Sequence, residues 1–147
     1  SGFVNKQSSL DDIAKMMIAN PNLKSIYVVN NEHKLVGRVT LKNLIKHEFS
    51  NFIPSSFQYF NALEFIGNKN VEEIMTSPVY VKDDDTLKTA FVKMYENTFE
   101  ELPVVDENLH LIGNIDLLEL LTILMEQKEK KLNNKFLKLV INRPFIR

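Results

Sequence analysis

The apolar residues of this chain recur at two spacings that alternate along it. Two stretches place them three and four residues apart, which is typical of a helix with one buried face. The first stretch holds Leu10, Ile13, Ala14, Met17 and Ile18, and the second holds Leu87, Ala90, Phe91, Met94 and Tyr95. Ser8 and Ser9 precede the first, and Asp85 and Thr86 precede the second, all residue types that favour a helix N-cap. We therefore predict a helix in each stretch.

Short β-branched runs flank each predicted helix. A short strand is expected before it, at 3–4 in one case and at 79–81 in the other. After it come two apolar runs separated by a polar turn, which predict a hairpin. The hairpin strands are expected at 26–29 and 35–39, and at 103–105 and 109–115. A closing helix follows each hairpin, with stripes of Leu41, Leu44, Ile45 and Phe49, and of Leu117, Leu120, Leu121 and Leu124. The order β-α-β-β-α predicts an α+β class, with the helices on one side of a sheet.

The two series are copies of one another. Gly37 and Gly113 lie 76 positions apart, and the same offset matches Val28 with Val104, Val29 with Val105, Leu35 with Leu111, Leu41 with Leu117 and Leu44 with Leu120. Upstream, an offset of 77 matches Val4, Leu10, Met17 and Asn20 with Val81, Leu87, Met94 and Asn97. Because a unit of about 50 residues is marginal alone, we expect the copies to pair. The expected organisation is repeat 1 at 3–49, an intervening segment at 50–70, repeat 2 at 71–126 and an extension at 127–147.

Composition excludes several classes of protein. The 147 residues carry a formal net charge of −1, no cysteine and four glycines. Without cysteine there is no thiol nucleophile or thiolate zinc site, and the near-neutral charge argues against a nucleic-acid binder. No apolar run has the roughly 18 to 20 residues of a membrane-spanning helix, and the chain lacks the clustered glycines of a phosphate-binding loop. We expect a soluble, cytoplasmic protein.

The repeated segments resemble a tandem pair of CBS domains, the arrangement called a Bateman module. The resemblance rests on Ile26-Tyr-Val-Val29 and Leu35-Val-Gly-Arg-Val-Thr40 in the first copy. In the second copy it rests on Ile74-Met-Thr-Ser-Pro-Val79, Pro103-Val-Val-Asp106 and Leu111-Ile-Gly-Asn-Ile-Asp116. It implies two pseudo-symmetric repeats packed through their sheets and a homodimer. It also implies a non-catalytic regulatory sensor, which binds AMP, ADP, ATP, S-adenosylmethionine or cyclic di-AMP in clefts between the repeats and needs no cofactor.

The resemblance places ligand residues at the start of the first closing helix, in Gly37-Arg-Val-Thr-Leu-Lys-Asn43. Thr40 would meet phosphate and Asn43 would meet ribose, while Arg38 and Lys42 would add positive charge if they point inward. A hydroxyl and free N–H groups at a helix N-terminus suit phosphate oxygens. Helix capping alone also explains Thr40.

The second copy departs from the family pattern, because Asp116 stands where the hydroxyl residue belongs. A carboxylate repels phosphate unless a cation or a basic group intervenes. Glu119 still offers acceptors to ribose. We therefore expect unequal clefts, of which the one using Thr40 and Asn43 is the better nucleotide site. Around the base, the resemblance implies Lys24, Ser25, Ile26, Tyr27, Thr76, Pro78, Val79, Glu101, Leu102 and Pro103, for all of which packing is the alternative explanation.

Two segments lie outside the repeats. Residues 50–70 are rich in aromatic residues, which predicts either a cap over the repeat or a surface for a partner or a second subunit. After Met125 the chain turns charged and then regains apolar residues, which predicts a helical extension that ends near Pro144. That extension either packs on its own domain or on a second subunit, or connects the sensor to a further domain.

Enzyme chemistry has little support in the sequence. His33, His47 and His110 fall on different predicted elements, so no metal site is expected. The acidic run 83–85 precedes a helix, where acids complement the helix dipole. We expect no catalytic residues. The alternative to a ligand sensor is a ligand-independent module for dimerisation or protein interaction.

Overall fold

The computed structural model describes residues 2–50 and 70–130. It divides into two compact units, and the described part of unit 1 is residues 2–31, 36–50 and 70–78. The described part of unit 2 is residues 32–35 and 79–130. Most of the predicted intervening segment and of the predicted extension lies outside the described residues.

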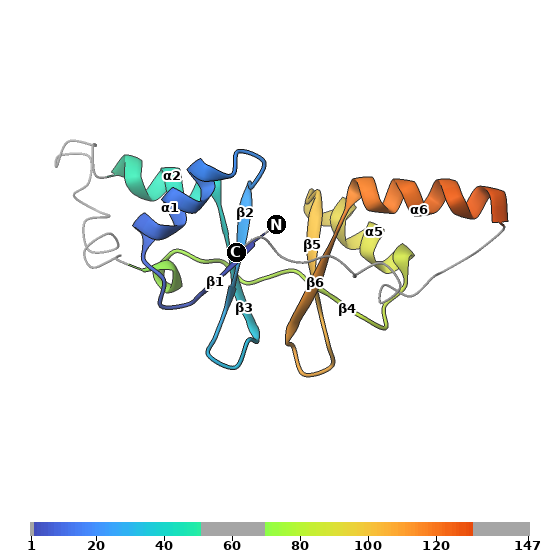
Figure 1. Cartoon of the computed structure of the whole chain (residues 1–147), viewed down its shortest axis with the longest axis horizontal. Helices are drawn as coiled ribbons and strands as arrows, with labels where there is room; N and C mark the ends of the chain where they lie inside the picture. Colours follow the sequence, from blue (N-terminus) through green and yellow to red (C-terminus); the bar gives the residue numbers. More distant parts are fainter. Residues whose placement is uncertain (1, 51–69, 131–147) are drawn as a thin grey trace. The chain divides into compact units, whose positions relative to one another are not determined.

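Unit 1 is built from β1 (Gly2–Asn5), α1 (Leu10–Ala19), β2 (Ser25–Val29), β3 (Leu35–Thr40), α2 (Leu41–Ser50) and the 3₁₀ turn η1 (Val71–Glu73). The sheet order is β1-β2-β3, and β1 runs parallel to β2. Both helices lie on one side of this sheet (Figure 1). The side chain of Ser9 caps α1 by accepting a hydrogen bond from the backbone N–H of Asp12 at 3.1 Å. This cap confirms the predicted helix start.

Unit 2 repeats the arrangement with β4 (Val81–Lys82), α5 (Leu87–Asn97), β5 (Glu101–Val105), β6 (Leu111–Asp116) and α6 (Leu117–Lys130). β4 is parallel to β5, and β5 is antiparallel to β6. Thr86 caps α5 through a 3.2 Å bond from the N–H of Thr89. The predicted order β-α-β-β-α is thus confirmed in both units. The strand predicted from 109 begins at 111, because Leu109 adopts a φ of 69° and closes the turn on the carbonyl of Asp106.

Each unit has a hydrophobic core of its own between its sheet and its two helices. In unit 1 the core holds Leu10, Ile13, Met17, Leu23, Ile26, Val28, Val39, Leu44 and Val71. In unit 2 it holds Val81, Leu87, Ala90, Met94, Leu102, Val104, Ile115, Leu120 and Ile123. Most members of the two cores occupy equivalent positions of the two copies. The duplication therefore preserves the interior of the fold.

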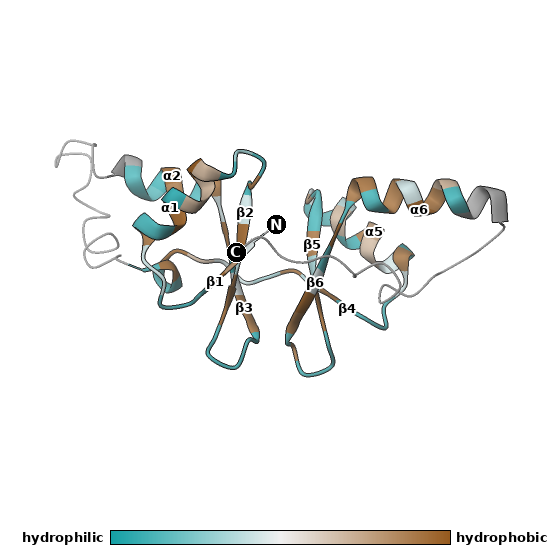
Figure 2. Cartoon of the chain, viewed as in Figure 1, coloured by the Kyte–Doolittle hydropathy of each residue, from teal (hydrophilic) through white to brown (hydrophobic). Residues whose placement is uncertain are grey.

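The buried face of each helix is narrower than its apolar stripe. The sequence pattern predicted that every stripe residue would be buried, and several are exposed. The exposed members are Ile18, Leu41, Ile45, Phe91, Tyr95, Leu117, Leu121 and Leu124. Brown, hydrophobic segments accordingly recur along α1, α2 and α6 in Figure 2. The sheet covers only one edge of each stripe, so every helix leaves an apolar edge in water.

Candidate functional site

The start of α2 is fixed to the sheet of unit 1 by two hydrogen bonds. The hydroxyl of Thr40, the last residue of β3, accepts a bond from the N–H of Asn43 at 3.1 Å. The N–H of Leu41 donates to the carbonyl of Lys24 at 2.9 Å, immediately before β2. Strand β3 therefore passes into α2 without a loop, and the first turn of the helix is held at the end of β2. This geometry confirms Thr40 as a helix cap.

The polar side chains of this site lie on the sheet face away from the helices. Side chains alternate between the two faces of a strand, and three members of β2 and β3 belong to the core under the helices: Ile26, Val28 and Val39. Their neighbours Ser25, Arg38 and Thr40 therefore point to the opposite face. There the guanidinium Nη2 of Arg38 donates to the hydroxyl of Ser25 at 3.3 Å, and Arg38 is only 7% exposed. A cation is thus held on the same face as the capping hydroxyl.

Residues 75–76 lie against β3. The backbone of Thr76 exchanges two hydrogen bonds with that of Arg38, at 3.0 and 2.9 Å, and the hydroxyl of Thr76 donates to the same carbonyl. Met75 packs over Gly37, where a Cβ would lie 2.8 Å from its Cγ and closer still to its Sδ. Only glycine leaves room for this approach. The contact brings the segment that leads to Pro78 alongside the predicted site.

Unit 2 builds an equivalent helix start from different chemistry. The carboxylate of Asp116 accepts a bond from the N–H of Glu119 at 2.7 Å. The N–H of Leu117 donates to the carbonyl of Glu100 at 2.9 Å. Where unit 1 pairs Arg38 with Ser25, the side-chain amide of Asn114 donates to the carboxylate of Glu101 at 3.5 Å. Equivalent hydrogen bonds therefore hold the helix start in each of the two units.

The charges around the two helix starts are opposite. Each residue around the start of α2 has an equivalent residue 76 positions later, at the start of α6. The equivalent pairs are Lys24 and Glu100, Ser25 and Glu101, Arg38 and Asn114, Thr40 and Asp116, Lys42 and Leu118, Asn43 and Glu119. Unit 1 carries three cations in this set and unit 2 carries four carboxylates. Sequence reasoning named neither Glu100 nor Asn114 as a site residue. The offset of 76, applied to Lys24 and Arg38, would have found both.

The remaining predicted residues fall into distinct surroundings. The side chains of Ile26 and Leu102 are in the two cores, so only their backbone is available to a ligand. Tyr27 and Pro103 are buried, Pro78 and Val79 are half-buried, and Lys24, Lys42 and Thr76 are exposed. The binding roles that the resemblance assigns to these residues remain predictions.

A hydroxyl and a carboxylate differ in what they offer after capping a helix. The oxygen of Thr40 accepts from the backbone and its O–H still donates, whereas an ionised Asp116 only accepts. Phosphate oxygens need donors and positive charge. The start of α2 therefore matches an anionic group, and the start of α6 does not.

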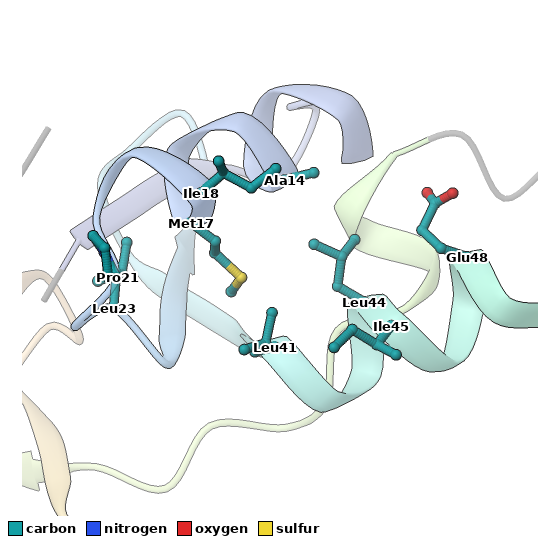
Figure 3. Close-up of a pocket in the computed structure, with 9 residues that line it drawn as sticks. All are labelled: Ala14, Met17, Ile18, Pro21, Leu23, Leu41, Leu44, Ile45 and Glu48. Carbon is teal, nitrogen blue, oxygen red and sulfur yellow. The ribbon is translucent and has the colours of Figure 1, made fainter.

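An apolar groove of about 650 Å³ lies between α1 and α2 of unit 1 (Figure 3). Its walls are side chains of α1, of α2 and of the turn between α1 and β2, on the helix side of the sheet and away from the face that carries Ser25, Arg38 and Thr40. The lining residues are Ala14, Met17, Ile18, Pro21, Leu23, Leu41, Leu44, Ile45 and Glu48. Glu48 is the one acidic group among them.

Two further kinds of site are absent from residues 2–50 and 70–130. No cluster of three or more His, Cys, Asp or Glu side chains there is arranged to hold a metal ion. Within the same residues, no helix has the length and apolar character needed to cross a membrane.

Comparison with known families decides what these repeats are. The CBS domain family matches residues 3–50 and 71–126. The chain belongs to the CBS domain family. It is a tandem CBS pair, and proteins built from such pairs are generally regulatory rather than catalytic.

Solved structures and curated relatives agree with this membership. The chain is 38% identical over 107 residues to the uncharacterized protein MJ1225 of Methanocaldococcus jannaschii. The aligned region covers 72% of this chain and 37% of that protein. A crystal structure of CBSX2 in complex with AMP has a TM-score of 0.69 and 25% identity, and covers 86% of this chain and 88% of that one. A CBS domain-containing protein of Thermotoga maritima has a TM-score of 0.63 and 30% identity, with 85% of each chain covered. The chain spans 37% of MJ1225 and 16 to 21% of the other curated relatives that it matches.

Proposed function

We propose that this CBS pair is a regulatory module whose unit 1 binds an adenosyl ligand carrying phosphate, such as AMP. The observation that carries the proposal is the start of α2, where a capping hydroxyl with a free donor proton lies on the same sheet face as Arg38. The AMP complex of CBSX2, which shares the fold, supports the ligand class. Regulation rather than catalysis is the function of CBS pairs in general.

Each polar residue at this helix start has a part in the proposal. The hydroxyl of Thr40 donates to a phosphate oxygen, and the positive end of the α2 dipole attracts the phosphate charge. The N–H groups of Leu41 and Asn43 are already bonded to Lys24 and Thr40 and orient the helix start. The side-chain amide of Asn43, one turn further on, bonds a ribose hydroxyl. Lys24 and Lys42 are exposed and Arg38 is buried, and all three make the local potential positive. The segment 76–78 and the backbone at the start of β2 contact the base.

Unit 2 does not bind phosphate in this proposal. Asp116 donates nothing when it is ionised, and Glu100, Glu101 and Glu119 add negative charge around the same helix start. Two like charges at about 4 Å repel by about 4 kcal/mol at the effective dielectric constant of a protein surface, which exceeds one ordinary hydrogen bond. We therefore expect one phosphorylated ligand per chain.

Ligand binding is expected to act on the rest of the protein by changing how the repeats or subunits pack. A ligand that binds only the folded chain adds about 2.7 kcal/mol of stability at 100 times its dissociation constant. If the repeats or subunits can pack in two ways and the ligand binds one arrangement better, occupancy shifts the equilibrium toward that arrangement.

A thermal-shift screen tests the proposed function. AMP, ADP, ATP, S-adenosylmethionine and cyclic di-AMP are compared with adenosine and with inorganic phosphate, each at millimolar concentration. We expect the Tm to rise with at least one phosphorylated adenosyl ligand, and to rise less with adenosine or phosphate alone. No shift with any adenosyl ligand would refute the function, and a shift with S-adenosylmethionine alone would refute the phosphate assignment.

A further inference from the structure

Helices α5 and α6 of unit 2 contact each other and present an apolar surface that is open to water. Five of its residues are counterparts, at the offsets of the repeat, of residues that line the α1/α2 groove of unit 1. They are 40 to 77% exposed: Phe91, Tyr95, Leu117, Leu121 and Leu124. Leu118 and Met125, 71% and 54% exposed, extend the surface along α6. These seven residues, the α5/α6 face, form an apolar patch of the kind that marks a binding surface in many soluble proteins.

The duplication shows that this face is more apolar than its counterpart. Leu118 stands where α2 has Lys42, and Leu124 stands where α2 has Glu48. On α5, the aromatic residues Phe91 and Tyr95 likewise stand where α1 has Ala14 and Ile18. Unit 2 therefore carries large apolar side chains at positions where unit 1 has charged or smaller ones. Such a surface is stabilised when another part of the protein covers it.

The charge of the chain is divided unevenly between its parts. The described part of unit 2 holds 13 acidic and 6 basic residues, a net charge of −7. The described part of unit 1 holds 5 acidic and 6 basic residues, a net charge of +1. Residues 131–147, which directly follow α6, contain five basic residues and no acidic one. The most basic segment of the chain is thus attached to its acidic unit, which attracts it electrostatically.

The same C-terminal segment has the apolar content and the length to cover the face. Its apolar residues are Leu132, Phe136, Leu137, Leu139, Val140, Ile141, Phe145 and Ile146. Four of them, at 132, 136, 139 and 140, have the spacing of a helical stripe. The 14 residues of α6 span about 21 Å, and 13 residues beyond a turn of about four span about 20 Å even as a helix. The segment is therefore long enough to return along most of α6.

We propose that residues 131–147 dock on the α5/α6 face of their own chain. The rings of Phe91 and Tyr95, stacked with their centroids 6.1 Å apart, supply a rigid apolar anchor. Glu96 and Glu126, each exposed and next in sequence to a residue of the face, supply negative charge for the basic segment. Because the segment is joined to α6, its effective concentration is about millimolar and a weak contact is enough. The docked segment competes with any other protein for this face. The proposal does not depend on ligand binding.

Paramagnetic relaxation enhancement in the full ¹⁵N-labelled chain tests this contact. The chain has no cysteine, so Asn142→Cys creates a single site for a nitroxide label. The nitroxide broadens the amide signals of residues near it, and the same sample with the label reduced is the reference. We expect the broadening to concentrate at the amides of residues 91–95 and 117–125. Broadening that spares these residues, or that is stronger at 14–18 and 41–45 beside the α1/α2 groove, would overturn the proposal.

Residues of the other copy supply a variant that should release the segment. Leu118→Lys with Leu124→Glu gives α6 the charged side chains of α2 and leaves the net charge unchanged. Both positions are exposed, so the variant should fold, which circular dichroism checks. The control, Ile18→Lys with Ile45→Glu, makes the same kind of exchange at exposed positions of unit 1. We expect the broadening at 91–95 and 117–125 to be lost in the variant and kept in the control. Any other combination would contradict the proposal.

Two further samples test the segment itself and separate its own chain from a second copy. Phe136→Asp with Val140→Asp removes apolar residues of the segment without touching either core, and it should also abolish the broadening. Persistent broadening in this variant would contradict docking through apolar contacts. In the other sample, ¹⁵N-labelled chain without nitroxide is mixed with unlabelled chain that carries it, and the signals of 91–95 and 117–125 should stay sharp. Broadening in the mixture would assign the docked segment to a second copy and overturn the proposal.

Discussion

The capping side chains of the two helix starts of this CBS pair differ in one functional group. Thr40 and Asp116 do the same structural work, since each accepts a hydrogen bond from the backbone three residues later, at 3.1 and 2.7 Å. Only the hydroxyl keeps a proton to donate once it has capped the helix. Capping and ligand binding are therefore compatible roles for Thr40. The two explanations that the sequence left open do not exclude one another.

Replacing Thr40 by Asp should separate those two roles. Aspartate keeps the helix cap but removes the donor and adds a negative charge, so the fold should remain and AMP binding should fall. A hydrogen bond to a charged group contributes about 1.5 to 3 kcal/mol, which corresponds to about a tenfold to hundredfold loss of affinity. Isothermal titration calorimetry measures it, with Thr40→Ser as the control that keeps the hydroxyl. Adenosine, which has no phosphate, should lose much less affinity than AMP, and an equal loss for both would contradict the role of Thr40.

At the scale of elements, the helices and strands could be predicted because their periods differ. Stripes at three and four residues placed α1 and α5, and their caps at Ser9 and Thr86 fixed the helix starts. The width of the buried face was not predictable in the same way. The spacing of apolar residues shows which face of a helix is turned toward the core. How many residues of that face the sheet covers depends on tertiary packing. Ile18 and Tyr95 remain exposed for that reason.

The candidate site was predictable only in part, because it is assembled by hydrogen bonds between elements. The motif around Gly37 located Thr40 and Asn43 from the sequence alone. The resemblance names Lys24 for a place near the base, which stays a prediction, and the bond from its carbonyl to the first N–H of α2 was not predictable from the sequence. The acidic counterpart, Glu100, carries no motif; the repeat offset matches it with Lys24, and its bond to Leu117 in the fold shows the equivalent role.

The charges at a helix start should be transferable between the two copies. Asp116→Thr with Glu100→Lys gives the start of α6 the hydroxyl cap and the cation found at the start of α2. We expect this double variant to bind a second AMP, so that calorimetry gives two sites per chain where the wild type gives one. Glu96→Lys makes the same kind of charge change on α5 and should leave the number of sites at one. A single site in the double variant would mean that these two residues do not decide which copy binds phosphate.

At the scale of the whole molecule, duplication has preserved the cores and diversified the surfaces. Equivalent residues fill the two interiors, whereas the helix starts differ in charge and the outer helix faces differ in shape. Under the proposed function, the charge difference leaves phosphate binding to unit 1. A chain with two identical copies would, on the same proposal, have two equal ligand sites.

The central claim is that a phosphorylated adenosyl ligand binds at the start of α2 and not at the start of α6. An NMR titration of the ¹⁵N-labelled chain with AMP tests it most directly, because each backbone amide reports its own surroundings. The account predicts saturable shifts at the amides of Leu41, Lys42 and Asn43, with little change at those of Leu117, Leu118 and Glu119. Shifts that appear first or equally at 117–119, or that spare 41–43, would contradict it.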